Sequence, residues 1–212
     1  MIISRLVKKG SSVDIHFIDG TVLKAAYEIV VKHGLRKDDD IEENKIQQIK
    51  KSSDLFLIKN TAFRLLGRRI HSRYELKLKL IKRKYETALI EDVLAELHGK
   101  GYLDDEKYAE QYIEEKIRIN KSGLNKIKRE LILRGISKEI IEEKLSQYEN
   151  KDEVLNNALL IATRKIKEIE NKGLTKIKVK QKIYSALLNR GYNPEIISQV
   201  IEQLNLNDSE ET

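Results

Sequence analysis

Apolar and polar residues alternate with a period close to two over residues 1–23, a pattern typical of half-buried β-strands. Asp19-Gly20 separates two short apolar stretches, and this dipeptide favours the tight turn of a β-hairpin. The pattern therefore predicts a small N-terminal β-hairpin. Its apolar positions are Ile2, Leu6, Val13, Ile15 and Phe17.

The spacing becomes helical from Lys24 onward. A short helix is expected to end near His33-Gly34, with Gly34 in the left-handed conformation that stops many helices. Asp38-Asp39-Asp40 offers N-caps for a second helix over about 41–52. We interpret this acidic run as a solvated helix start rather than an ion site. Residues 1–53 are thus predicted to form a β-hairpin and short helices.

The rest of the chain contains an internal repeat. Leu80-Ile81-x-Arg83, Leu131-Ile132-x-Arg134 and Leu187-Leu188-x-Arg190 follow one another at spacings of 51 and 56 residues, and the apolar pairs downstream keep the same offsets. Each block predicts a helix, a tight turn and a second helix, with a further helix before it over about 55–68, 105–119 or 152–170. Such units must stack or chain together to bury their apolar faces. We expect units at 54–104, 105–150 and 151–206, followed by a disordered acidic tail at 207–212.

Local signals at the turns support the repeat. Gly135 and Gly191 occupy one repeat position, where a glycine ends the helix, whereas the first copy has Lys84 there. Ser137 and Asn193 are expected to cap the following helices, and Pro194 suits the first helical position. Asp104-Asp105-Glu106 reads as a helix cap with acidic residues at the positive helix end. Metal or acid–base chemistry is the less favoured interpretation of these carboxylates.

Composition excludes several classes of site. The 212 residues include no cysteine, so disulfides and thiolate metal sites are absent. None of the four histidines lies three or four residues from another, and no glycine-rich phosphate loop is present. We therefore expect neither a cofactor nor an enzyme. No apolar run approaches the roughly 20 residues of a membrane helix, which favours a cytoplasmic protein without membrane contact.

Positive charge is concentrated in three windows, at residues 64–84, 116–134 and 164–182. Together they hold 24 Lys/Arg and four Asp/Glu, a net charge of +20, although the whole chain carries only +7. The remainder therefore carries −13.

The windows recur at the junction of the first and second helices of each unit and along the second helix. A single basic helix face is usually just solvated surface, but three equivalent faces predict a basic stripe for a phosphate backbone. Lysines outnumber arginines and few aromatics interleave with them, which favours backbone contact over base reading.

Four motifs follow one another along the chain: Ala62–Arg69 followed by Ser72–Leu76, then Gly101–Ala109 with Tyr112, then Gly123 with Lys128–Leu131 and Arg134–Ile136, and finally Arg190–Tyr192 with Ile196-Ile197. In this order they resemble the RecX family. The resemblance covers about residues 55–204, and the N-terminal segment is similar to an extra segment of some longer members. The chain departs from the family pattern at Ile70-His71, where members often have proline, and at Lys84.

The resemblance implies a mainly α fold, with three tandem three-helix units in an elongated, curved array. It also implies a monomer that binds in the groove of the RecA–DNA filament, contacts single- and double-stranded DNA, and inhibits or tunes the recombinase without catalytic residues. Two alternatives stay open, a general DNA- or RNA-binding helical array and an enzyme whose site forms only in space. The residues expected to contact DNA or filament are Arg68, Arg69, Arg73, Lys77, Arg118, Lys121, Lys126, Arg129, Lys172, Lys176 and Lys178.

Overall fold

A computed structural model describes residues 1–149 and 152–206. The chain forms two compact units, residues 1–103 and 104–212. The acidic tail expected at 207–212 lies outside the described residues. The predicted boundaries at 53/54, 104/105 and 150/151 stay predictions.

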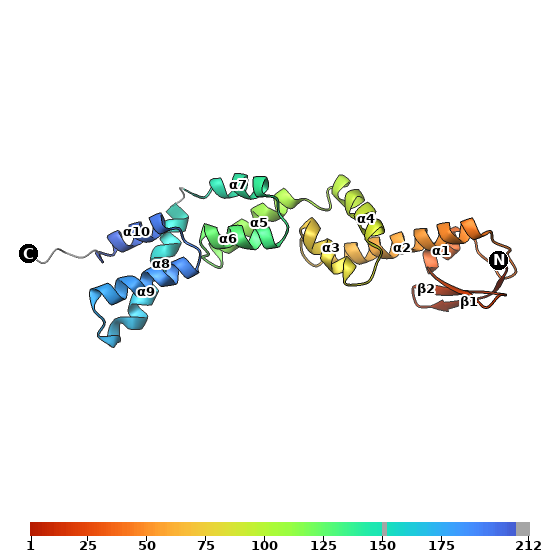
Figure 1. Ribbon diagram of the computed structural model, residues 1–212, viewed down its shortest axis with the longest axis horizontal. Coiled ribbons are helices and arrows are strands. Elements are labelled where there is room, and N and C mark those ends of the chain that lie inside the picture. The colour runs from red at the N-terminus through yellow and green to blue at the C-terminus, as the bar shows by residue number, and fades with distance from the viewer. Residues whose placement is uncertain (150–151, 207–212) are drawn as a thin grey trace, which may run out of the picture. The chain divides into compact units, whose positions relative to one another are not determined.

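The first unit begins with a three-stranded antiparallel sheet of β1 (Ile3–Lys9), β2 (Ser12–Phe17) and β3 (Val22–Ala26), in that order (Figure 1). The Asp19-Gly20 turn joins β2 to β3, which confirms the predicted hairpin. A third strand forms because β1 also pairs with β2, with Leu6 opposite Ile15. Since β3 extends to Ala26, helix α1 (Tyr27–Lys32) begins later than Lys24, and Gly34 follows it at φ +62° as expected.

Helix α2 (Glu43–Leu66) is continuous, so the prediction of separate helices over 41–52 and 55–68 was wrong. The three aspartates do not cap it either. Asp39 accepts a hydrogen bond from the Arg36 amide, at 2.7 Å, and Asp40 pairs with the N-terminal ammonium, at 3.0 Å. Inside α2, the buried Ser53 hydroxyl accepts a hydrogen bond from the Ala26 amide at 2.7 Å, which fastens the helix to β3.

Because it is so long, α2 contributes to two apolar cores. Ile46 and Ile49 pack against the sheet and α1, whereas Ile58 and Ala62 pack against the last two helices of the unit. Those helices are α3 (Arg73–Ile81) and α4 (Thr87–Gly99). The second half of α2 therefore serves as the first helix of a three-helix set.

The second unit contains two further three-helix sets around one continuous core. Its elements are α5 (Asp105–Arg118), α6 (Leu124–Leu133), α7 (Lys138–Ser146), α8 (Asp152–Ile169), the short 3₁₀ helix η1 (Glu170–Lys172), α9 (Lys176–Asn189) and α10 (Pro194–Gln203) (Figure 1). The expected helices over 105–119 and 152–170 are confirmed by α5 and α8. The chain is thus mainly helical, with three three-helix sets.

The turn between the second and third helices has the same backbone form in all three sets. Gly135 and Gly191 have φ values of +73° and +88°, and Lys84 takes the equivalent left-handed conformation at φ +64°. Lys84 therefore keeps the shape of the first turn, at a cost of about 1 kcal/mol relative to glycine. The caps also form as predicted, since Ser137 and Asn193 accept hydrogen bonds from amides three residues ahead.

Candidate nucleic-acid interface

The four predicted contact residues of the first window lie on α3 and on the turn before it. Arg68 is exposed, while Arg69 forms an ion pair with Glu75 at 3.0 Å. Arg73 and Lys77 share one carboxylate, that of Glu91 on α4, at 2.8 and 2.5 Å. Hydrogen bonds from Lys77 and Arg73 lower the pKa of Glu91, so it is ionised at neutral pH. The structure therefore tethers Arg73 and Lys77 and partly neutralises them.

A buried histidine fixes the turn that carries Arg68 and Arg69. The His71 side chain is only 3% exposed. Its Nδ1 lies 2.9 Å from the Arg69 carbonyl oxygen, and its Nε2 lies 2.7 Å from the Lys79 ammonium, so Nδ1–H donates and Nε2 accepts. Burial lowers the pKa of His71 and favours the neutral ring that this arrangement needs. The sequence did not predict this role of His71, although its position between a basic pair and the Ser72 cap was a signal.

The four predicted contact residues of the second window have different environments. Arg118 is exposed and pairs with Glu114 at 3.0 Å, and Arg129 is exposed on α6. Lys126 is half-buried at the start of α6. Lys121 has a left-handed backbone, at φ +51°, and its ammonium donates to Asn157 at 2.9 Å. Lys121 therefore has a structural role that its sequence position did not reveal.

Lys121 belongs to a joint between the second and third helix sets. The Tyr192 hydroxyl donates to the Lys121 carbonyl oxygen at 2.8 Å, and the buried Asn157 amide donates to the Ile117 carbonyl oxygen at 3.0 Å. These bonds link the end of α5 to α8 and to the turn before α10. Burial raises the pKa of Tyr192, so its hydroxyl stays protonated as a donor.

Two glycines allow the same joint to close. The Gly123 amide donates to the Arg190 carbonyl oxygen at 2.9 Å, and the Asn125 amide donates to the Gly191 carbonyl oxygen at 3.0 Å. A Cβ atom on Gly123 would lie 2.2 Å from the Gly191 carbonyl carbon, and one on Gly191 would lie 2.3 Å from the Lys126 Cβ. The backbones therefore meet too closely for any side chain. The start of basic helix α6 is consequently fixed against the third set.

Other cations of the second window are engaged by an aromatic cluster. The Tyr112 hydroxyl donates to Glu130, and Lys116 forms an ion pair with the same carboxylate at 3.5 Å. The Arg134 guanidinium lies 4.5 Å from the centre of the Tyr112 ring and also donates to the Glu130 carbonyl oxygen at 2.8 Å. These contacts hold α5 against α6. They leave Arg118 and Arg129 as the more exposed cations of the window.

The three predicted contact residues of the third window are all exposed. Lys172 ends η1 and is exposed, and Lys176 and Lys178 are exposed in the first turn of α9. Thr175 caps that helix by accepting from the Lys178 amide at 3.5 Å. Because α9 follows a turn at Gly173 (φ +57°), its lysines begin immediately after the end of the first helix of the set. The predicted location of this window at a helix junction is confirmed.

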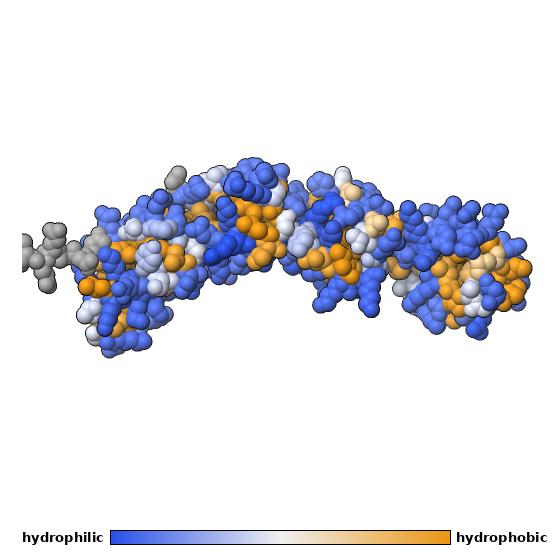
Figure 2. Space-filling view, in the orientation of Figure 1, coloured by the Kyte–Doolittle hydropathy of each residue, from blue (hydrophilic) through white to orange (hydrophobic). Residues whose placement is uncertain are grey.

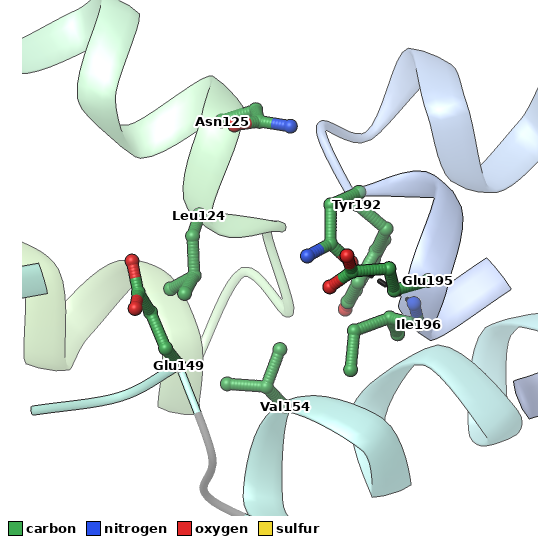
Figure 3. Close-up of a pocket in the computed structure, with 8 residues that line it drawn as sticks. Leu124, Asn125, Glu149, Val154, Tyr192, Glu195 and Ile196 are labelled. Atoms are coloured by element: carbon green, nitrogen blue, oxygen red, sulfur yellow. Dashed lines mark hydrogen bonds between the residues drawn. The ribbon is translucent and has the colours of Figure 1, made fainter. Parts of the chain in front are cut away.

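A cavity of about 260 Å³ also lies in the second unit, where α6 faces α8 and α10 (Figure 3). Glu149 and Glu195 reach it from different elements, and Leu124, Val154 and Ile196 supply its apolar wall. The charged residues in its lining are both acidic, so it repels anions. The candidate contact surface for phosphate is therefore the set of basic windows and not this cavity.

The described part of the chain lacks two further classes of feature. No group of three or more histidine, aspartate or glutamate side chains is placed to hold a metal ion among residues 1–149 and 152–206. None of the helices in the same ranges combines the length and the hydropathy that crossing a bilayer requires.

The structure thus defines a tandem three-helix protein in which each set has a basic second helix. Three family profiles match it: RecX, first three-helix domain, over residues 59–97; RecX, second three-helix domain, over 104–145; and RecX, third three-helix domain, over 151–201. The chain belongs to the RecX family.

Curated relatives agree with this assignment. The chain is 33% identical to regulatory protein RecX of Clostridium perfringens (strain SM101) over 181 residues, covering 85% of this chain and 84% of that protein. It is 32% identical to regulatory protein RecX of Clostridium acetobutylicum over 198 residues, covering 93% and 92%.

Solved structures share the fold. A crystal structure of regulatory protein RecX superimposes with a TM-score of 0.72 at 19% identity, over 95% of this chain and 98% of that chain. The structure of RecX from Lactobacillus salivarius gives a TM-score of 0.67 at 23% identity, over 74% and 99%. Because the first of these matches covers 95% of this chain, it includes much of the N-terminal sheet as well as the helices.

Proposed function

We propose that this protein is a non-catalytic, monomeric, cytoplasmic regulator that binds the RecA–DNA filament and lowers recombinase activity. Membership of the RecX family supports regulation of RecA. The groove of such a filament offers DNA phosphates together with protein carboxylates, and basic side chains can bind both. The proposed contacts are the eleven residues predicted from the sequence, with the exposed ones contributing most.

The observation that carries this proposal is the recurrence of cations at one place in each three-helix set. Arg68, Arg129 and Lys178 are exposed examples from the three windows. The windows hold +20 of net charge in a chain of +7, so the surface elsewhere is acidic on balance. Ion pairs with Glu75 and Glu91 reduce the charge of the first window, while α9 contains four lysines and no acidic residue.

A filament assay tests this function against the general nucleic-acid-binding alternative. RecA is assembled on single-stranded DNA with ATP, and ATP hydrolysis and strand exchange are measured while the protein is added. We expect both activities to fall at protein concentrations below those that saturate bare DNA. Unchanged hydrolysis at concentrations that do saturate bare DNA would instead support a DNA-binding helical array without a recombinase partner.

A further inference from the structure

Helix α9 exposes an apolar stripe along the middle of its basic surface. Ile177, Tyr184 and Leu188 are 57%, 38% and 45% exposed. At 100° per residue they fall within an arc of about 40°, whereas Ile183 and Leu187 point to the core and are fully buried. Scattered apolar residues on a surface are ordinary, but several aligned on one face of a helix make a candidate interaction site. We call Ile177, Tyr184 and Leu188 the α9 ridge.

Charge surrounds this ridge. Lys176, Lys178, Lys180 and Lys182 alternate along α9, which contains no acidic residue between 176 and 189. Ile177, Lys180, Gln181, Tyr184 and Ser185 line a shallow groove of about 500 Å³ on this face. The α9 ridge is therefore an apolar strip with cations beside it over the first two turns of the helix.

A related stripe occurs on the second helix of the first set. Tyr74, Leu78 and Ile81 are exposed on α3, at spacings of four and three residues. Figure 2 shows hydrophobic residues reaching the visible surface over this helix. Ile81, Ile132 and Leu188 occupy one repeat position, and all three are exposed. An exposed aliphatic residue near the end of the second helix is thus a property of the repeat and not an accident of α9.

We propose that the α9 ridge docks onto an acidic amphipathic helix of a protein partner, with apolar residues of that helix against the ridge and carboxylates against the flanking lysines. Exposed isoleucine and leucine side chains gain nothing from a hydrated phosphate backbone, because their free energy falls only when another apolar surface covers them. A helix with an apolar stripe between acidic residues satisfies both features of α9. Its tyrosine also suits the centre of a protein interface, where aromatic residues are enriched.

This inference rests on the proposed function, since the filament supplies the protein partner. It adds that the α9 ridge itself contacts the protein component and not the DNA, whereas the lysines of the third window keep the phosphate contacts proposed for bare DNA. One helix face covers far less than the area of a stable interface, so the ridge acts together with contacts made elsewhere on the chain. Removal of the ridge should therefore weaken filament binding without changing binding to bare DNA.

The test uses the full chain with Ile177→Ser, Tyr184→Ser and Leu188→Ser combined. These side chains lie outside the core, so the fold should persist, and circular dichroism at 222 nm checks this independently of DNA binding. A matched control combines Ile18→Ser and Val31→Ser, which change exposed apolar residues of the first unit. Affinity is measured for bare single-stranded DNA, duplex DNA and RecA assembled on single-stranded DNA.

We expect the ridge variant to lose about tenfold or more in filament affinity, the scale of losing a central interface residue, and to keep DNA affinity within about twofold. The control variant should match the wild type in every assay. Unchanged filament affinity of the ridge variant overturns the inference. An equal loss on DNA and filament also overturns it, because the ridge would then be a nucleic-acid surface. If the wild type itself binds filaments no better than bare DNA, the proposed function fails instead.

Discussion

The glycine contact between the second and third helix sets gives a quantitative prediction of stability. Gly123 has an ordinary φ of −74°, so Gly123→Ala adds only a steric conflict, with backbone atoms 2.2 Å from the new Cβ. Gly191 has φ +88°, so Gly191→Ala adds backbone strain to a conflict at 2.3 Å. Gly173 has φ +57° with open space around it, so Gly173→Ala adds strain alone. Comparison of the three variants therefore separates the cost of backbone strain from the cost of the steric conflict within one unit.

The expected magnitudes follow from these geometries. Left-handed strain in alanine costs about 1 kcal/mol, which is the whole effect expected for Gly173→Ala. Forcing a methyl group into a closed contact costs about 2 kcal/mol, the effect expected for Gly123→Ala. Gly191→Ala combines both, so we expect about 3 kcal/mol, increased further if the hydrogen bond from the Asn125 amide to its carbonyl is lost.

Urea unfolding followed by circular dichroism at 222 nm measures these differences, with the wild type as the reference. The predicted order of destabilisation is Gly191→Ala, then Gly123→Ala, then Gly173→Ala. A Gly123→Ala variant that is as stable as the wild type would refute the close contact on which the joint depends. An equal loss in Gly173→Ala and Gly191→Ala would show that strain alone matters.

Three further predictions concern the same joint and the first basic window. Tyr192→Phe removes the hydrogen bond to the Lys121 carbonyl and should cost about 1 kcal/mol in urea unfolding, so an unchanged midpoint would contradict it. Asn157→Leu should cost about 2 kcal/mol, because it leaves the Lys121 ammonium and the Ile117 carbonyl without this partner; a neutral effect would show that the bonds do not stabilise the joint. The folded-state pKa of His71 is depressed, so the unfolded chain binds protons more readily near pH 6.5. Stability should therefore fall as pH drops from about 7 towards 5, and this component should vanish in His71→Asn; equal pH profiles would exclude the role of His71.

Local signals predicted much of the fold. The turns at Gly135 and Gly191 and the caps at Ser137 and Asn193 depend on residues within a few positions of one another, so the sequence reveals them. The continuity of α2 was missed because a contact that fixes its middle, the hydrogen bond from the Ala26 amide to the Ser53 hydroxyl, joins residues 27 positions apart. The third strand was missed for a similar reason, since strand pairing is a long-range interaction.

The candidate site, like the fold, is predicted by the sequence only where local signals determine it. The sequence places cations on the second helices, because charge and periodicity are local properties. It does not show which cations are engaged by distant partners, such as Arg73 by Glu91, or Lys121 by Asn157. The close backbone contact between Gly123 and Gly191 also joins residues 68 positions apart, so the local sequence around either glycine does not predict it.

The three basic windows are most directly tested by the salt dependence of duplex DNA binding. One variant for each window removes two exposed cations: Arg68→Gln with Lys82→Gln, Arg118→Gln with Arg129→Gln, and Lys172→Gln with Lys178→Gln. A control removes two exposed cations outside the windows, Lys37→Gln with Lys45→Gln. The slope of log K against log salt measures the number of phosphate contacts, at about 0.9 for each contact.

If all three windows contact the backbone, each window variant should reduce the magnitude of this slope by about 1 to 2, and the control should leave it unchanged. A control that lowers the slope as much as the window variants would contradict the account, because general charge would then explain binding. Window variants that all keep the wild-type slope would exclude the windows as the phosphate-binding surface.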